Sequence, residues 1–299
     1  MAVAELATQQ KLLVVVVPSS ASAAALEREL PLFSAAALNI LTLPDWETLP
    51  YDNFSPHQDI VSERLSTFHL LQDIAEGVLI VPITTLMQRT PPVHYVAGSS
   101  LVLDVGQALD SKTLVHNLTL NGYRAVDTVY EHGEYAVRGS LLDIFPMGSQ
   151  VPYRIDLFDA EIESLRTFDP ETQRTITKVD SIRLLPAREF PLTEEGIRRF
   201  KLNWYRKFDG DPEACPLFNE ICAGRVPGGA EYFLPLFFDG CGTVFDYLPD
   251  HAALITLGDH YQAASQFWTE ITSRHTEYGV DVRRPLLPPS EVFIPTEVL

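Results

Sequence analysis

The chain has 299 residues, a hydrophobic content of 46% and a formal net charge of −18, with 22 basic residues against 40 acidic ones. This length allows two or three globular domains with hydrophobic cores. The acidic balance argues against a large non-specific nucleic-acid footprint, because phosphate binding depends on Lys and Arg side chains that neutralise the backbone. Only five basic residues are Lys, so most positive charge sits on guanidinium groups, which pair with carboxylates in a two-pronged geometry.

The cysteines and the apolar runs exclude two further classes of protein. Cys215, Cys222 and Cys241 have no CxxC spacing, which argues against a zinc site and against a disulfide framework. The apolar run 12–17 is too short for a signal sequence or a membrane span. We therefore expect a cytoplasmic protein with reduced thiols, no metal and no membrane partner.

The first hundred residues alternate between strands and helices. The runs 12–18, 38–44 and 77–82 are apolar without alternation, which is typical of strands buried on both faces of a parallel sheet. Residues 59–74 have apolar side chains at helical spacing, and Ser19 or Ser20 can cap an earlier helix. This order predicts an α/β domain.

The pattern changes near residue 100 and again near residue 186. Residues 111–123 predict one short amphipathic helix, and 135–175 predict strands separated by turns, which together indicate an α+β module with an antiparallel sheet. A helix begins at 193–195, followed by a buried strand at 252–257 and a helix over 261–275. We divide the chain into 1–99 (α/β), 100–185 (the inserted α+β domain 2) and 186–299, which completes domain 1.

The stretch "PYRIDLFD" (152–159) presents different residues on its two faces. Because side chains alternate along a strand, Tyr153, Ile155 and Leu157 share one face, which is the expected core side. The other face carries Arg154, Asp156 and Phe158, and aromatic and Arg side chains are typical anchors of protein interfaces. A solvated sheet face explains the same pattern on the residues alone.

The preceding stretch "AVRGSLLDIFP" (136–146) adds a second arginine. Gly139 after Arg138 allows a bend or a close backbone approach. If the two stretches pair, Arg138 and Arg154 lie near one another, although the sequence leaves the register open. Asp143, inside an apolar strand, is expected to pair with a neighbouring Arg or a backbone donor.

Three long motifs resemble a known family. "LPDWETLPYDNFSPHQDIVSERLSTFHLL", "LIVPITTLMQR" and "VYEHGEYAVRGSLLDIFPMGSQVPYRIDLFDAEIESLRTFDPETQRT" are similar to the N-terminal region of the Mfd family of bacterial transcription-repair coupling factors, which is itself similar to the excision-repair protein UvrB. The resemblance covers nearly the whole chain. It implies a degenerate helicase, RecA-like domain 1 with a parallel sheet, split by an inserted domain 2.

The resemblance also implies a partner and a surface. In the family, domain 2 docks UvrA, the damage-recognition ATPase, and the positions that match its contact residues are Arg138, Arg154 and Phe158. Asp156, Asp159 and Glu161 are possible secondary contacts.

The family further implies downstream parts that bind RNA polymerase and translocate along DNA with ATP and Mg²⁺, and a C-terminal part that masks the UvrA surface. We expect none of these, and no cofactor, in this chain, so it would be a non-catalytic adaptor that binds UvrA constitutively.

An enzymatic alternative comes from UvrB, a nucleotide-dependent helicase relative that binds damaged DNA. The chain contains no Gly-Lys dipeptide for a phosphate loop and no Asp-Glu pair to hold Mg²⁺. UvrB's DNA-wedging β-hairpin is also missing. A phosphate loop trimmed from the N-terminus would keep this alternative open, and tight Mg-ATP binding by a longer chain would favour it.

Several single residues have ordinary structural interpretations. Asp259 matches the position of UvrB's ATPase acids, but a loop acid or helix cap is the better interpretation. His57 and His132 lie beside acids without a nucleophile nearby, so we interpret both as structural. For the aromatic segment 46–52 we expect core packing rather than base stacking.

Overall fold

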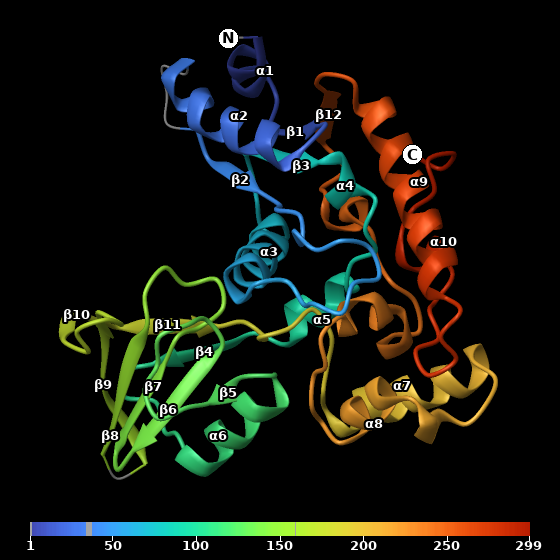
Figure 1. Ribbon diagram of the computed structural model, residues 1–299. Coiled ribbons are helices and arrows are strands. Elements are labelled where there is room, and N and C mark those ends of the chain that lie inside the picture. The colour runs from blue at the N-terminus through green and yellow to red at the C-terminus, as the bar shows by residue number, and fades with distance from the viewer. Residues whose placement is uncertain (1, 34–37, 159) are drawn as a thin grey trace.

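The computed structural model describes residues 2–33, 38–158 and 160–299. Figure 1 shows a parallel sheet at the top, an antiparallel sheet at the lower left and a helical group at the lower right.

The parallel sheet has the strand order β12-β1-β3-β2. Its strands are β1 (Leu12–Val17), β2 (Ile40–Thr42), β3 (Gly77–Pro82) and β12 (Ala252–Thr256). The central strands β1 and β3 are buried along their whole length, as their unbroken apolar runs predict. Because β12 comes from the far end of the chain, the sheet is completed only after the antiparallel region. The predicted fold class, a parallel-sheet domain split by an α+β insertion, is confirmed.

One expectation about this sheet is wrong. The run 252–257 was expected to be a buried strand, but β12 is an edge strand whose residues are half-buried or exposed, and Leu254 is 45% exposed. An edge strand has a neighbour on one side only, and an apolar composition does not distinguish it from a central strand.

Helices cover both faces of the parallel sheet. Leu13, Val15 and Val17 face a cluster with α1 (Ala2–Gln9) and α2 (Ser20–Phe33). The alternate residues Leu12 and Val14 face α3 (Gln58–Leu71), α4 (Ile83–Leu86) and α9 (His260–Tyr278) in the main core. This alternation produces a three-layer α/β arrangement.

The antiparallel region holds six strands in the order β10-β9-β8-β7-β6-β5. Their bounds are β5 (Arg124–Ala125), β6 (Glu134–Arg138), β7 (Leu141–Ile144), β8 (Tyr153–Phe158), β9 (Glu161–Phe168) and β10 (Thr175–Val179). All pairs are antiparallel except β5 with β6. The helix α6 (Ser111–Leu120) supplies Leu114 and Leu118 to the core beside this sheet.

The chain enters and leaves this region through two paired strands. The strand β4 (Leu101–Asp104) pairs antiparallel with β11 (Ser181–Leu184), and α5 (Val93–Gly98) precedes it. The domain limits at 99/100 and 185/186 stay a prediction.

The last third of the chain is mainly helical. Its elements are α7 (Glu194–Lys207), α8 (Pro216–Cys222), α10 (Pro289–Val292) and the 3-10 helices Pro212–Ala214, Ala230–Phe237 and Val244–Tyr247. They enclose a second core rich in aromatic rings, in which Trp46 and Tyr51 are buried. The expectation of core packing for segment 46–52 is therefore confirmed at both rings.

None of the helices in the described ranges is long and apolar enough to cross a membrane.

Candidate functional site

The two faces of strand β8 separate as the alternation predicts. Ile155 is fully buried, and Tyr153 and Leu157 are partly buried against the same core. On the opposite face, Phe158 is 66% exposed. The assignment of the core face and the outer face is therefore confirmed.

The register places the two arginines on either side of one buried acid. Asp143 of β7 lies opposite Arg154 of β8, and Arg138 ends the neighbouring strand β6. The Asp143 side chain is 1% exposed and forms ion pairs with both guanidinium groups. Strand β7 thus joins two arginines that lie 16 positions apart in the sequence, and the expected pairing of Asp143 with a neighbouring Arg is confirmed.

Arg138, Asp143 and Arg154 form a triad, in which Asp143 is held most tightly by Arg154. Its Nε donates to Asp143 Oδ1 at 2.7 Å and its Nη2 donates to Oδ2 at 2.9 Å, which is the two-pronged arrangement of a strong charge-assisted pair. The Arg154 guanidinium also lies over the ring of Phe168, 4.9 Å from its centroid. The hydrogen bond to Asp143 raises the pKa of Arg154 above its ordinary value.

Arg138 is held less tightly. Its Nη2 donates to Asp143 Oδ2, and its side chain is 49% exposed. Gly139 follows with φ +64 and no atom within 4 Å of an added Cβ, so this glycine provides the bend and not a close backbone approach.

The placement of Arg154 corrects one expectation. Arg154 lies on the face opposite the core side, as the alternation predicts, and we expected it to be exposed there, but its side chain is only 17% exposed. The β9–β10 turn lies close to it, because the Gln173 carbonyl accepts a hydrogen bond from Arg154 Nη1 at 3.4 Å. Arg154 therefore compensates a buried charge as well as facing the outer surface.

The secondary candidates differ in their surroundings. Asp156 is half-buried on the Arg154 side of β8, and Glu161 is exposed where β9 begins. Asp159 lies outside the described residues.

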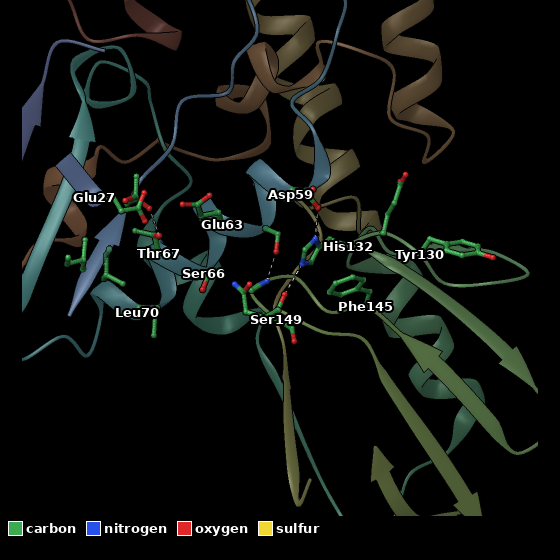
Figure 2. A pocket seen from close by; sticks show the side chains of 17 residues that line it. Glu27, Asp59, Glu63, Ser66, Thr67, Leu70, Tyr130, His132, Phe145 and Ser149 are labelled. Atoms are coloured by element: carbon green, nitrogen blue, oxygen red, sulfur yellow. Dashed lines mark hydrogen bonds and ion pairs between the residues drawn. The ribbon is translucent and has the colours of Figure 1, made fainter. Parts of the chain in front are cut away.

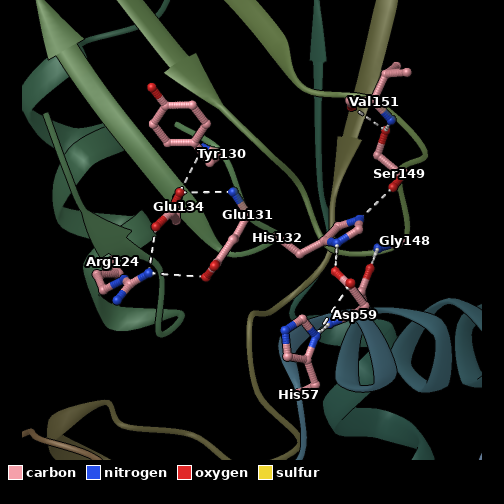
Figure 3. Close-up of polar contacts among 11 residues, drawn as sticks. His57, Asp59, Arg124, Tyr130, Glu131, His132, Glu134, Gly148, Ser149 and Val151 are labelled. Atoms are coloured by element: carbon pink, nitrogen blue, oxygen red, sulfur yellow. Dashed lines mark hydrogen bonds and ion pairs between the residues drawn. The ribbon is translucent and has the colours of Figure 1, made fainter. Parts of the chain in front are cut away.

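The predicted histidines have structural roles. His57 caps α3, since its Nδ1 accepts from the Asp59 backbone N–H at 3.3 Å. Figure 3 shows His132 between Asp59 Oδ1 (2.7 Å) and the Ser149 carbonyl (2.8 Å). His132 thereby links α3 to the loop after β7.

A polar cavity of about 630 Å³ lies beside this link, between β2, α3 and the loops that flank β6 and β7 (Figure 2). Its acidic residues include Glu27 and Glu63, and burial with the nearby Glu27 charge raises the pKa of Glu63. Arg138, Arg154 and Phe158 do not line it. The predicted contact residues therefore lie on an open sheet surface and not in this cavity.

Asp259 is the N-cap of α9, because its Oδ1 accepts from the Gln262 N–H at 3.0 Å. The interpretation as a helix cap is confirmed. Among the residues that the structure describes, no group of three or more His, Cys, Asp or Glu side chains is placed to hold a metal ion.

Sequence reasoning missed three neighbours of the triad. The ring of Phe168 packs against the Arg154 guanidinium. Arg166 of β9 lies opposite Arg154, and Lys178 of β10 lies opposite Arg166. The alternation of residues 161–168 could have suggested that Arg166 and Phe168 share a face, but only the register places them beside Arg154.

The surface lies within a recognised domain type. Residues 101–190 match the family model of the UvrB interaction domain, which includes the whole six-stranded sheet and the β4–β11 pair. This part of the chain is thus similar to the UvrB interaction domain.

Three relatives extend the similarity to nearly the whole chain. The transcription-repair-coupling factor of Escherichia coli K12 is 44% identical over 96% of this chain and 25% of its own length. That of Haemophilus influenzae is 44% identical over 98% of this chain and 26% of its own length. That of Myxococcus xanthus is 35% identical over 88% of this chain and 23% of its own length.

The resemblance identified from the sequence is confirmed, because the chain matches the N-terminal, UvrB-like region of the transcription-repair-coupling factors. The chain spans about a quarter of the length of these relatives.

Proposed function

We propose that this chain is a docking module that recruits the repair ATPase UvrA in transcription-coupled nucleotide excision repair. The outer face of the β6–β9 sheet is the proposed contact surface, with Arg138, Arg154 and Phe158 as its anchors. The observation that carries the proposal is the buried Asp143, which orients two guanidinium groups on the face where Phe158 is exposed. The match to the UvrB interaction domain supports it.

The chemistry of the surface suits a protein partner. Asp143 compensates one of the two positive charges, so the triad keeps a net charge of about +1 and favours a carboxylate on the partner. Phe158 supplies exposed apolar area at the end of the same strand as Arg154, and interface energy concentrates in such aromatic and Arg anchors. The module itself would act without catalysis.

The same surface implies competition. A chain that offers a UvrB-like face would compete with UvrB for UvrA, so a coupling factor held at a stalled polymerase could transfer the repair machinery to the lesion. In the longer relatives, displacement of RNA polymerase would require an ATP-dependent translocase, and a C-terminal part would mask this face until the motor engages.

Titration calorimetry of purified UvrA against the chain and three variants tests the proposal. Phe158→Ala should weaken binding by roughly 2 kcal/mol, about 30-fold in Kd, without unfolding the chain, because the ring is mostly exposed. Arg138→Ala should weaken it about tenfold.

Phe54→Ala is the matched control, since Phe54 is 71% exposed outside this sheet and its loss should leave the affinity unchanged. Wild-type affinity in both Phe158→Ala and Arg138→Ala would refute the proposed surface.

A further inference from the structure

A row of positive charge crosses the antiparallel sheet. Strand pairing places Arg154 of β8 opposite Arg166 of β9, and Arg166 opposite Lys178 of β10. Directly opposed residues of an antiparallel pair project from the same face, with Cβ atoms about 5 Å apart. Like charges in this position destabilise a sheet, so the row is an unfavourable arrangement for folding alone.

Only one end of the row is neutralised. Asp143 pairs with Arg154 and Arg138, whereas neither Arg166 nor Lys178 has a carboxylate within 4.0 Å among the residues that the structure describes. Lys178 is exposed and Arg166 half-buried. This excess is local, because residues 100–185 carry eight basic and thirteen acidic residues.

Unpaired polar atoms collect at the same place. Eight buried side-chain atoms lack a hydrogen-bond partner in the described chain, and three of them lie on β9 or in the β9–β10 turn. They are Ser164 Oγ and Arg166 Nε on β9, and Gln173 Oε1 in the turn that contacts Arg154. A buried polar atom without a partner costs free energy, so the sheet is incompletely satisfied around this row.

We propose that Arg166 and Lys178 are further contact residues, which extend the Arg138–Arg154–Phe158 surface into a docking strip across β8, β9 and β10. The inference rests on the proposed function. Strands lie about 4.8 Å apart, so Arg154 and Lys178 are separated by about 10 Å across the sheet. The partner surface therefore carries at least two carboxylates about 10 Å apart, one for the Arg138–Arg154 pair and one for Arg166 and Lys178.

Carboxylates fit this strip better than nucleic-acid phosphates do. A strand of DNA brings a continuous line of charge, which the −18 net charge of the chain repels outside the strip. A protein surface can place two carboxylates opposite the strip and keep other acids away from it.

The test uses charge reversal in the full 299-residue chain with purified UvrA. Lys178→Glu should weaken UvrA binding about tenfold, and Arg166→Ala about fivefold. Lys178→Glu should also leave the melting temperature unchanged or raise it, because it replaces a like-charge pair with Arg166 by an opposite pair. Weaker binding together with undiminished stability is a signature that a merely structural lysine would not produce.

Matched controls are Lys112→Glu and Arg183→Ala. Lys112 is exposed on α6, and Arg183 is exposed on β11, so both change charge outside the six-stranded sheet. Equal UvrA affinity for Lys178→Glu and Lys112→Glu would overturn the extension of the surface. If Phe158→Ala and Arg138→Ala also bound UvrA with wild-type affinity, the proposed function would be overturned together with the extension.

A 20-base-pair DNA duplex is the remaining probe. We expect no binding that depends on Lys178. If the chain bound the duplex, and this binding was lost in Lys178→Glu and fell steeply with salt, the partner of the strip would be nucleic acid and not a carboxylate-bearing protein.

Discussion

Removal of the Arg154 side chain should destabilise the sheet although the residue belongs to the proposed docking surface. Arg154→Ala eliminates two hydrogen bonds to the buried Asp143 carboxylate and the contact with the Phe168 ring. A hydrogen bond to a charged group contributes about 1.5–3 kcal/mol, and a buried acid that loses its only partner costs about 3–5 kcal/mol. Because Arg138 stays paired with Asp143, we expect an intermediate loss of about 2–3 kcal/mol.

Hydrogen exchange of the β7 and β8 amides is the appropriate assay for this loss. Trp46, Trp204 and Trp268 all lie outside the antiparallel sheet, so tryptophan fluorescence reports on other parts of the chain. The opening free energy of these amides should fall by about 2–3 kcal/mol in Arg154→Ala and by about 1 kcal/mol in Arg138→Ala. A change below about 0.5 kcal/mol in Arg154→Ala would show that Asp143 does not depend on this arginine.

Three further predictions test the core, the buried acids and the helix caps. Ile155→Ala should lower the stability of the antiparallel sheet by about 2–5 kcal/mol through the cavity it leaves, measured by the same amide exchange, and a loss below 1 kcal/mol would contradict the assignment of the core face. Burial raises the pKa of Glu231 to about 7, so the folded state favours the protonated form and the free energy of unfolding should fall as the pH rises from about 4.5 to 7. Glu231→Gln should remove this pH dependence and unfold at a higher urea concentration than the wild type at pH 8. An unchanged pH profile in Glu231→Gln would refute the assignment of this pH dependence to Glu231. Asp259→Ala should destabilise the start of α9 by about 1 kcal/mol, seen as faster amide exchange at Gln262, and Asp259→Asn, which retains the capping oxygen, should behave like the wild type.

The sequence by itself determined the local elements and the two-part organisation of this protein. Unbroken apolar runs specify β1 and β3, because strands covered by helices on both faces need no polar residues. Period-two alternation specifies which face of β8 is buried, since Ile155 and Phe158 lie an odd number of positions apart. Both patterns lie within a single strand, so they predict its burial without knowledge of the partner strands.

Only the tertiary structure decided how the candidate surface is assembled. Arg138, Asp143, Arg154, Arg166 and Lys178 come from five strands, and cross-strand register depends on turns and bulges that alternation along one strand does not encode. The same limit explains the two corrections. The exposure of β12 depends on which strands flank it, and the burial of Arg154 depends on a turn that returns over the sheet some twenty residues later. Charge pairing and exposure are properties of neighbours in space, and a linear pattern specifies neighbours only within one element.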